Sequence, residues 1–205
     1  GTEMDYVQVH GNSDDGIEFY GGTVNLKHGV FTNNNDDSVD WDEGYQGNLQ
    51  YIIVKQGAAK GEAFEMDTEG SSSGFLSKPT LSNVTVVVEK VADRADYSLN
   101  FKKRSAGFFH NTVVTVSPDS ETALTTCVNV DGSGSQALVG EALVLNNWIQ
   151  DCASGSGDRG TLANVAGLNN GTIAAVAAQL DDNFASQASA AVLPNTIDWA
   201  AVNSA

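Results

Sequence analysis

Cysteine and long apolar runs are scarce in this chain of 205 residues. Its two cysteines, Cys127 and Cys152, are too few for a disulfide framework, so the chain holds either one bridge or two buried thiols. No stretch of about 18 consecutive apolar residues occurs, and this excludes a membrane-spanning helix. No basic segment followed by an apolar run stands at the start, so we expect a mature or trimmed form without a signal peptide.

Positive charge is also in short supply. Lys and Arg together number 10 against 26 Asp and Glu, which gives a formal net charge of −16. Nucleic acids and anionic lipids both select basic surfaces, so this balance argues against either as a partner. It suits a protein that meets cations, neutral glycans or basic partners.

Several signatures of catalysis are missing from the sequence. It contains no serine-nucleophile elbow, no phosphate-binding loop and no dinucleotide fingerprint. Its histidines, His10, His28 and His110, do not group with cysteine at the spacing of a zinc site. We therefore expect solvated or turn-stabilising roles for these histidines.

The chain does contain a repeated phrase, because DDGIEF at 14–19 returns as DDSVDW at 36–41. Around this phrase the sequence divides into six lines, each with a first strand, a polar turn and a second short strand. The first strands are predicted at 4–9, 26–31, 49–54, 81–86, 109–114 and 145–150. The second strands are predicted at 16–19, 38–41, 63–66, 98–101, 127–130 and 162–165.

This pattern predicts an all-β fold, a right-handed parallel β-helix of about six coils. Short strands rich in Val, Ile, Phe and Thr exclude helical repeat arrays, and one coil alone cannot bury its apolar face. Stacking at about 4.8 Å per coil joins the apolar faces into one core. A sandwich or barrel is the rival fold, but it needs Asn-Gly-type hairpin turns, which are scarce here.

The second strands line up as a column in this arrangement. Alternation turns two large residues inward and leaves the residue between them outside. The inward pairs are Ile17/Phe19, Val39/Trp41, Phe64/Met66, Leu99/Phe101, Val128/Val130 and Ala163/Val165. The outward residue is Glu18, Asp40, Glu65, Asn100, Asn129 and Asn164 in successive coils.

The two ends of the chain differ from the middle. We assign residues 1–167 to the β-helix and residues 168–205 to a partly helical C-terminal capping segment, because 172–192 is rich in Ala with a helical apolar spacing. Residues 1–9 show no cap. We expect either that earlier coils precede them or that the first coil docks on another chain, since an uncovered coil end invites stacking.

Residues 10–22, HGNSDDGIEFYGG, and 32–47, TNNNDDSVDWDEGYQG, resemble right-handed β-helix proteins of the broad pectate-lyase-like superfamily. More narrowly, together with KPTLSNVTVV at 78–87, they look like secreted or lipid-anchored bacterial β-helix proteins. The resemblance implies the fold, export, and an extracellular or cell-surface location in bacteria. It covers residues 1–100 well and the rest in outline.

Some members of this superfamily are enzymes. Polygalacturonase-like hydrolases carry Gly-His-Gly and Arg-Ile-Lys motifs near clustered aspartates, and both motifs are missing here. Pectate lyases hold calcium with aspartates and use an arginine base, but Arg94, Arg104 and Arg159 do not adjoin the DD phrases. The sequence therefore leans against an enzyme and leaves the question open.

Seven carboxylates form the candidate metal site. In stacked coils, like charges about 5 Å apart repel, so something must compensate them. Backbone amides in Asx-type turns, a Ca²⁺ ion with its six to eight oxygens, or a catalytic carboxylate pair are the three alternatives. The candidate ligands are Asp14, Asp15, Glu18, Asp36, Asp37, Asp40 and Glu65.

Three further residues are candidates for binding. Tyr20 and Tyr45 follow second strands at turns, where they form either exposed platforms for a glycan or local packing against the next coil. Asn100 comes after Glu65 in the outward column, and its favoured role is in a ladder of stacked amides with Asn129 and Asn164. The inward position of Trp41 predicts a core residue.

These observations predict an exported, non-catalytic cell-surface or extracellular scaffold that binds glycan or calcium or assembles end to end through its coil ends. The alternative is a polysaccharide lyase or glycoside hydrolase acting on acidic polysaccharide. A lysine or arginine beside the acidic column would favour the alternative. The basic run Lys102 to Arg104 is predicted to be a solvated turn or an ionic contact with the acidic corner of a neighbouring subunit.

Overall fold

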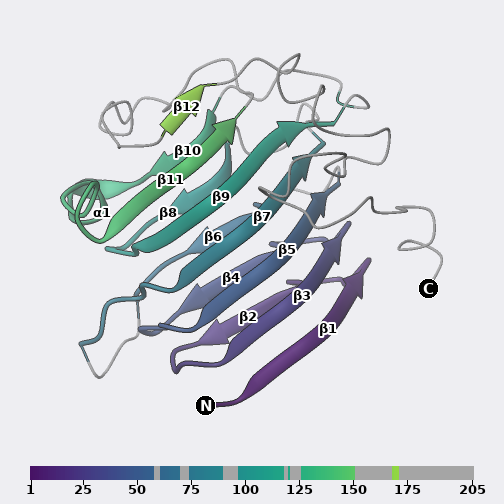
Figure 1. The fold of residues 1–205 in the computed structure, drawn as a ribbon, viewed down its shortest axis with the longest axis horizontal. Helices are drawn as coiled ribbons and strands as arrows, with labels where there is room; N and C mark the ends of the chain where they lie inside the picture. The colour runs from purple at the N-terminus through teal and green to yellow at the C-terminus, as the bar shows by residue number, and fades with distance from the viewer. Residues whose placement is uncertain are drawn as a thin grey trace.

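The chain forms two parallel sheets that face each other across one core (Figure 1). This computed structural model describes residues 1–57, 61–69, 74–89, 97–117, 120, 126–150 and 168–170. The long sheet contains β1 (Glu3–His10), β3 (Asn25–Thr32), β5 (Asn48–Gln56), β7 (Thr80–Val88), β9 (Gly107–Val116), β11 (Leu143–Gln150) and β12 (Leu168–Asn170). The short sheet contains β2 (Ile17–Tyr20), β4 (Val39–Asp42), β6 (Phe64–Met66), β8 (Tyr97–Phe101) and β10 (Thr126–Val130).

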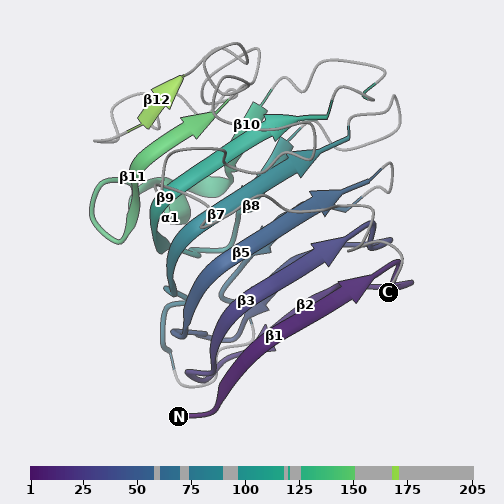
Figure 2. The ribbon, with the colours of Figure 1, turned by 45° about the vertical axis from the view of Figure 1, so that its right-hand side comes forward.

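Up to β11 the chain alternates between the two sheets, and each strand pairs in parallel with the matching strand of the next coil. The one described helix, α1 (Gly132–Gln136), lies in the connection from β10 to β11. Parallel pairing throughout confirms the β-helix and rules out the sandwich or barrel built from hairpins. Figure 2 shows the long strands stacked one above another along the axis.

The strand predictions are confirmed for every sequence repeat that the structure describes. All six first strands and the first five second strands are present. The sixth second strand, at 162–165, lies outside the described residues, as does most of the predicted cap. β12 begins at Leu168 and extends the long sheet next to β11, while the division after residue 167 stays a prediction.

Five of the long strands, β1, β3, β5, β7 and β9, each contain one residue with a positive φ angle. These residues are Tyr6, His28, Tyr51, Asn83 and Asn111, with φ between 52° and 59°. They form an outward column in which the Tyr6 and His28 rings stack at 4.5 Å and the His28 and Tyr51 rings at 5.1 Å. Asparagine tolerates this conformation, whereas stacking compensates its cost for tyrosine and histidine.

The core is aromatic at its centre. The Phe109 ring lies 5.7 to 6.3 Å from those of Trp41, Phe64, Phe101 and Trp148, mostly edge to face. All five side chains are fully buried. The inward position predicted for Trp41 is therefore confirmed, and its indole N–H donates to the Ser105 hydroxyl at 3.1 Å.

The turn before β2 explains why glycine follows the two aspartates of the first phrase. A Cβ atom at Gly16 would lie 2.4 Å from Nδ2 of Asn34 and 2.5 Å from the Ser38 carbonyl oxygen. Asn34 is buried, and its side-chain oxygen accepts from the Asn12 backbone N–H at 3.3 Å. The Asn12 backbone is therefore bonded to the 33–35 turn of the next coil, since its carbonyl oxygen also accepts from the Asn35 backbone N–H at 2.9 Å.

Cys127 is buried and disulfide-bonded. The chain has one other cysteine, Cys152, which lies outside the described residues. The bridged alternative therefore holds. None of the described helices is long and apolar enough to cross a membrane.

Candidate functional site

The outward face of the short sheet carries the predicted column in register. Glu18 lies opposite Asp40, Asp40 opposite Glu65, Glu65 opposite Asn100, and Asn100 opposite Asn129. Parallel strands one coil apart place such partners about 4.8 Å apart. The column therefore passes from three carboxylates to two amides along the axis.

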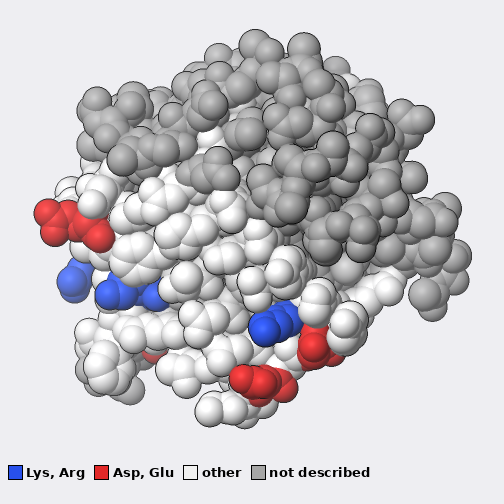
Figure 3. Space-filling model, viewed as in Figure 1, with Lys and Arg blue, Asp and Glu red and all other residues white. Residues whose placement is uncertain are grey.

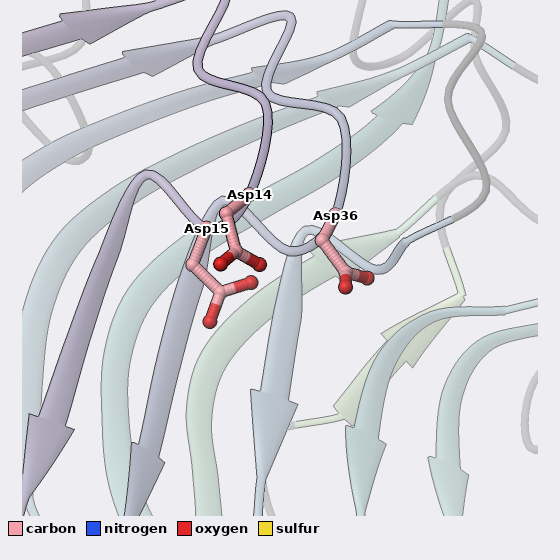
Figure 4. A group of neighbouring side chains, drawn as sticks. All are labelled: Asp14, Asp15 and Asp36. Atoms are coloured by element: carbon pink, nitrogen blue, oxygen red, sulfur yellow. The ribbon is translucent and has the colours of Figure 1, made fainter.

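A second column runs along the turn before these strands. The carboxylate of Asp15 accepts a hydrogen bond from the Asp37 backbone N–H at 3.0 Å, and Asp37 accepts in turn from the Glu62 backbone N–H. Backbone N–H groups therefore bond some of the carboxylate oxygens. This is the first of the three kinds of compensation that the sequence left open. Figure 4 shows Asp14 and Asp15 side by side in one turn, with Asp36 beside them in the next.

The carboxylates gather in three overlapping groups. In each group one ligand oxygen per residue lies within 4.8 Å of the others. The groups are Asp14/Asp15/Asp36, Asp15/Glu18/Asp40 and Asp37/Asp40/Glu65. Asp15 and Asp40 each belong to two groups, so all seven predicted ligands form one continuous surface, which we call the acidic face.

Burial and mutual repulsion raise the pKa values on the acidic face. Burial first, then the charges of Glu65, Asp15 and Glu18, raises the pKa of Asp40 to about 8. Burial is also the main cause that raises the pKa of Asp15 to about 6, against the effect of the Asp37 backbone N–H. These carboxylates therefore take up protons near neutral pH unless a cation compensates their charge.

Two neighbouring pairs extend this pattern. Asp37 and Glu62 are both buried, and burial with the adjacent Glu62 carboxyl raises the pKa of Asp37 strongly. Burial and a hydrogen bond with Asp67 raise the pKa of Asp42 to about 7. Neither Glu62 nor Asp67 was among the predicted site residues. The sequence does not reveal that they lie beside Asp37 and Asp42, because the loops before and after β6 differ in length from those of the first coils.

A lysine lies beside the acidic column. The ammonium of Lys102 is 2.6 Å from the Glu65 carboxylate and 3.9 Å from that of Asp67. Burial alone lowers the pKa of Lys102, but the contact with Glu65 outweighs it and the pKa is raised. Lys103 pairs with Asp67 at 3.3 Å and with Glu69.

The basic run therefore contacts the acidic corner of its own chain, and the prediction of a solvated turn is wrong for Lys102. The predicted contact with a neighbouring subunit is not needed to explain these lysines. Lys102 also provides the basic residue that the enzyme alternative asks for, at the Glu65 end of the face.

Tyr45 is not an exposed platform, and that expectation is wrong. Its ring is fully buried, stacks on Phe19 at 4.5 Å, and its hydroxyl donates to the Val24 carbonyl oxygen at 2.7 Å. The turn after β4 folds this side chain under the preceding coil, so Tyr45 belongs to the local-packing alternative.

Tyr20 and Asn100 lie where the predicted columns place them. Tyr20 is 68% exposed at the end of β2, and a hydrogen bond with Glu18 raises the pKa of its phenol to about 12. Asn100 is buried, and its side-chain oxygen accepts from the Asn129 amide at 2.9 Å. The Asn100–Asn129 step of the amide ladder is therefore formed, and Tyr20 is the one exposed side chain among the three candidate binding residues.

A family model for the pectate-lyase-like β-helix domain matches residues 1–201. No curated protein and no solved structure gave a significant match. The match covers nearly the whole chain and agrees with the two stacked parallel sheets. The chain belongs to the pectate-lyase-like β-helix domain family.

Proposed function

We propose that this protein is an exported, non-catalytic β-helix scaffold that binds Ca²⁺ on its acidic face. The observation that carries the proposal is the position of Asp40, whose carboxylate belongs to two of the three groups with ligand oxygens within 4.8 Å. Calcium prefers six to eight oxygens from carboxylates, carbonyls and water. A divalent cation would compensate several of these charges at once.

The electrostatics of the face support a cation. Two like charges about 4 Å apart repel by about 1 kcal/mol in water and about 4 kcal/mol at an effective dielectric constant near 20. Lys102 compensates Glu65, and backbone N–H groups compensate Asp15 and Asp37 in part. Among the described residues, no lysine or arginine forms an ion pair with Glu18 or Asp40.

The test compares thermal unfolding with calcium and with a chelator. Calcium at about 100 times its Kd stabilises the native state by about 2.7 kcal/mol, which raises the unfolding midpoint by several degrees. Asp40→Asn removes a shared ligand and a repelled charge. We therefore expect this variant to melt higher than the parent in chelator and to gain little from calcium.

Glu141→Gln is the matched control, because it removes one exposed carboxylate from the loop before β11. This variant should gain as much from calcium as the parent. Equal midpoints of the parent protein in calcium and in chelator would end the proposal.

Export is supported by the disulfide at Cys127, since structural disulfides persist in oxidising compartments. We propose a bacterial extracellular or cell-surface location, which the disulfide and the family support. Glycan binding is supported by Tyr20, whose exposed ring adjoins Glu18 and lies opposite Asp42. Loss of binding to a glycan array in Tyr20→Ala, with calcium binding retained, would separate this role from the cation.

The second candidate function is an enzyme acting on acidic polysaccharide. It is favoured by the pKa of about 8 at Asp40, beside carboxylates whose charge opposes its ionisation, and by Lys102 at the Glu65 end of the face. A protonated Asp40 beside an ionised carboxylate suits the general acid and base roles in glycoside cleavage. Incubation with polygalacturonate tests it: new reducing ends or unsaturated products, both lost in Asp40→Asn, would replace the scaffold proposal.

End-to-end self-association is the remaining proposal about partners. β1 and β2 stand at the ends of their sheets, and strand edges are templates for pairing. Light scattering of the purified protein over a range of concentrations should show a rising mass. A constant monomer mass would contradict it.

A further inference from the structure

A set of side chains on the long sheet is buried without belonging to the core. These residues form what we call the outer patch. They are Ile53 (7% exposed), Thr85 (0%), Val87 (0%), Val113 (4%) and Thr115 (1%). None of the three apolar members is part of the contiguous hydrophobic cluster that fills the β-helix.

Alternation along the strands explains this difference. In β5, Ile52 and Val54 belong to the core cluster, so Ile53 between them points to the opposite face. In β7, Val84 and Val86 are core residues and alternate in the same way with Thr85 and Val87.

The strand register joins these positions into one surface. Ile53 lies opposite Thr85, and Thr85 lies opposite Val113. Val87 lies opposite Thr115 on the same side of the sheet. The outer patch therefore spans three adjacent strands, about 10 Å across from the first to the third.

An outward sheet face becomes buried only when something covers it. No described helix or strand lies over this face, since α1 sits at one end of the strands and the other elements form the two sheets (Figures 1 and 2). Over the described surface in the view of Figure 1, charged side chains occur only in small, scattered groups (Figure 3). The Thr85 hydroxyl is buried without a hydrogen-bond partner, an exception to the usual pairing of buried polar groups that is consistent with a cover offering apolar side chains.

The sequence supplies one segment with the right length and composition. Thirty-five residues, 171–205, follow β12, and the stretch 171–193 is rich in Ala. Apolar side chains recur there at helical spacing, on one face that includes Ile173, Val176, Leu180 and Phe184. A helix of this length is about 34 Å long, enough to cross the outer patch.

The other undescribed stretches fit less well. Residues 90–96, KVADRAD, and 121–125, ETALT, are short and mostly polar, and 151–167 is rich in Gly, Ser and Asp. We propose that residues 171–193 form an amphipathic helix that docks its apolar face on the outer patch of the same chain. The C-terminal segment then covers the side of the β-helix rather than only its end.

Thiol labelling of the full-length chain tests the docking. Thr85→Cys places one reactive thiol in the outer patch, while Cys127 is already disulfide-bonded. The helix face is disrupted by the pair Leu180→Asp and Phe184→Asp. A matched pair, Ser186→Asp and Ser189→Asp, adds the same charge to the opposite helical face.

We expect labelling of the Thr85→Cys thiol to be slow in the parent and in the matched pair. It should be faster by on the order of tenfold or more with Leu180→Asp and Phe184→Asp, because docking no longer protects the patch. Circular dichroism with an unchanged β signal shows that the β-helix itself is retained. Equal labelling rates in all three folded proteins would overturn the proposal.

A photo-crosslinker attached to the same thiol gives a second readout that needs no disruptive variant. Peptides from 171–193 of the same chain should dominate the crosslinked products. Crosslinks to 90–96, to 121–125 or between two chains would overturn the assignment.

Discussion

Asp40 is the residue on which the electrostatics of the acidic face depend. Its partners in register are Glu18 and Glu65, and its pKa is raised to about 8 by burial first and by their charges next. A raised carboxyl pKa means that the folded state binds a proton more tightly than the unfolded state does. The charged form is therefore the one that destabilises the fold.

This sign gives a prediction for the dependence of stability on pH. The contributions of Asp15 and Asp40 to the free energy of unfolding are fully present below the unfolded-state pKa of about 3.9. They are lost as pH rises through the folded-state pKa values, about 6 for Asp15 and about 8 for Asp40. In chelator, the unfolding midpoint should therefore fall between pH 4 and pH 8. Asp40→Asn should flatten the upper part of this fall, whereas a parent midpoint that rises across the range would contradict the assignment.

At the scale of an element, the turn before each short strand is set by close packing between coils. Gly16 lies against Asn34 and Ser38 of the next coil, and no side chain fits between them. The same turn carries Asp14 and Asp15 into the acidic face. Turn geometry and site geometry are therefore specified together.

Substitution of Gly16 tests this coupling. Gly16→Ala introduces a Cβ atom at 2.4 Å from Asn34, so we expect a loss of about 2 to 4 kcal/mol in the free energy of unfolding, together with weaker calcium binding. Gly11→Ala is the control, because its Cβ meets nothing within 4 Å and only its φ of +65° opposes the change, at about 1 kcal/mol. Urea unfolding curves measure both, and equal losses would refute the packing argument.

The elements also show which parts of the site the sequence could predict. Glu18, Asp40 and Glu65 were predictable as vertical neighbours because strand alternation and the repeated phrase are local signals. The burial of Tyr45 was not, since it depends on a contact with Phe19 of the preceding coil. Lys102 follows the same phrase in SLNFK, but its contact with Glu65 depends on how a long loop lets β8 stack on β6.

At the scale of the whole molecule, the fold followed from the sequence because each coil repeats one pattern and stacks only on its neighbours. The outer patch did not follow from it, because its members are ordinary outward positions of three strands and only their burial reveals a cover. The same molecule thus carries an acidic face on the short sheet and a buried patch of valine, isoleucine and threonine on the outer side of the long sheet.

The central claim is that the stacked carboxylates hold a cation, and a crystal structure grown in calcium tests it most directly. The account predicts a Ca²⁺ ion at about 2.3 to 2.6 Å from an Asp40 oxygen, with further ligands from the Asp15 and Glu18 group or from the Asp37 and Glu65 group. Carboxylates contacted only by water or by each other, in crystals grown at saturating calcium, would contradict it.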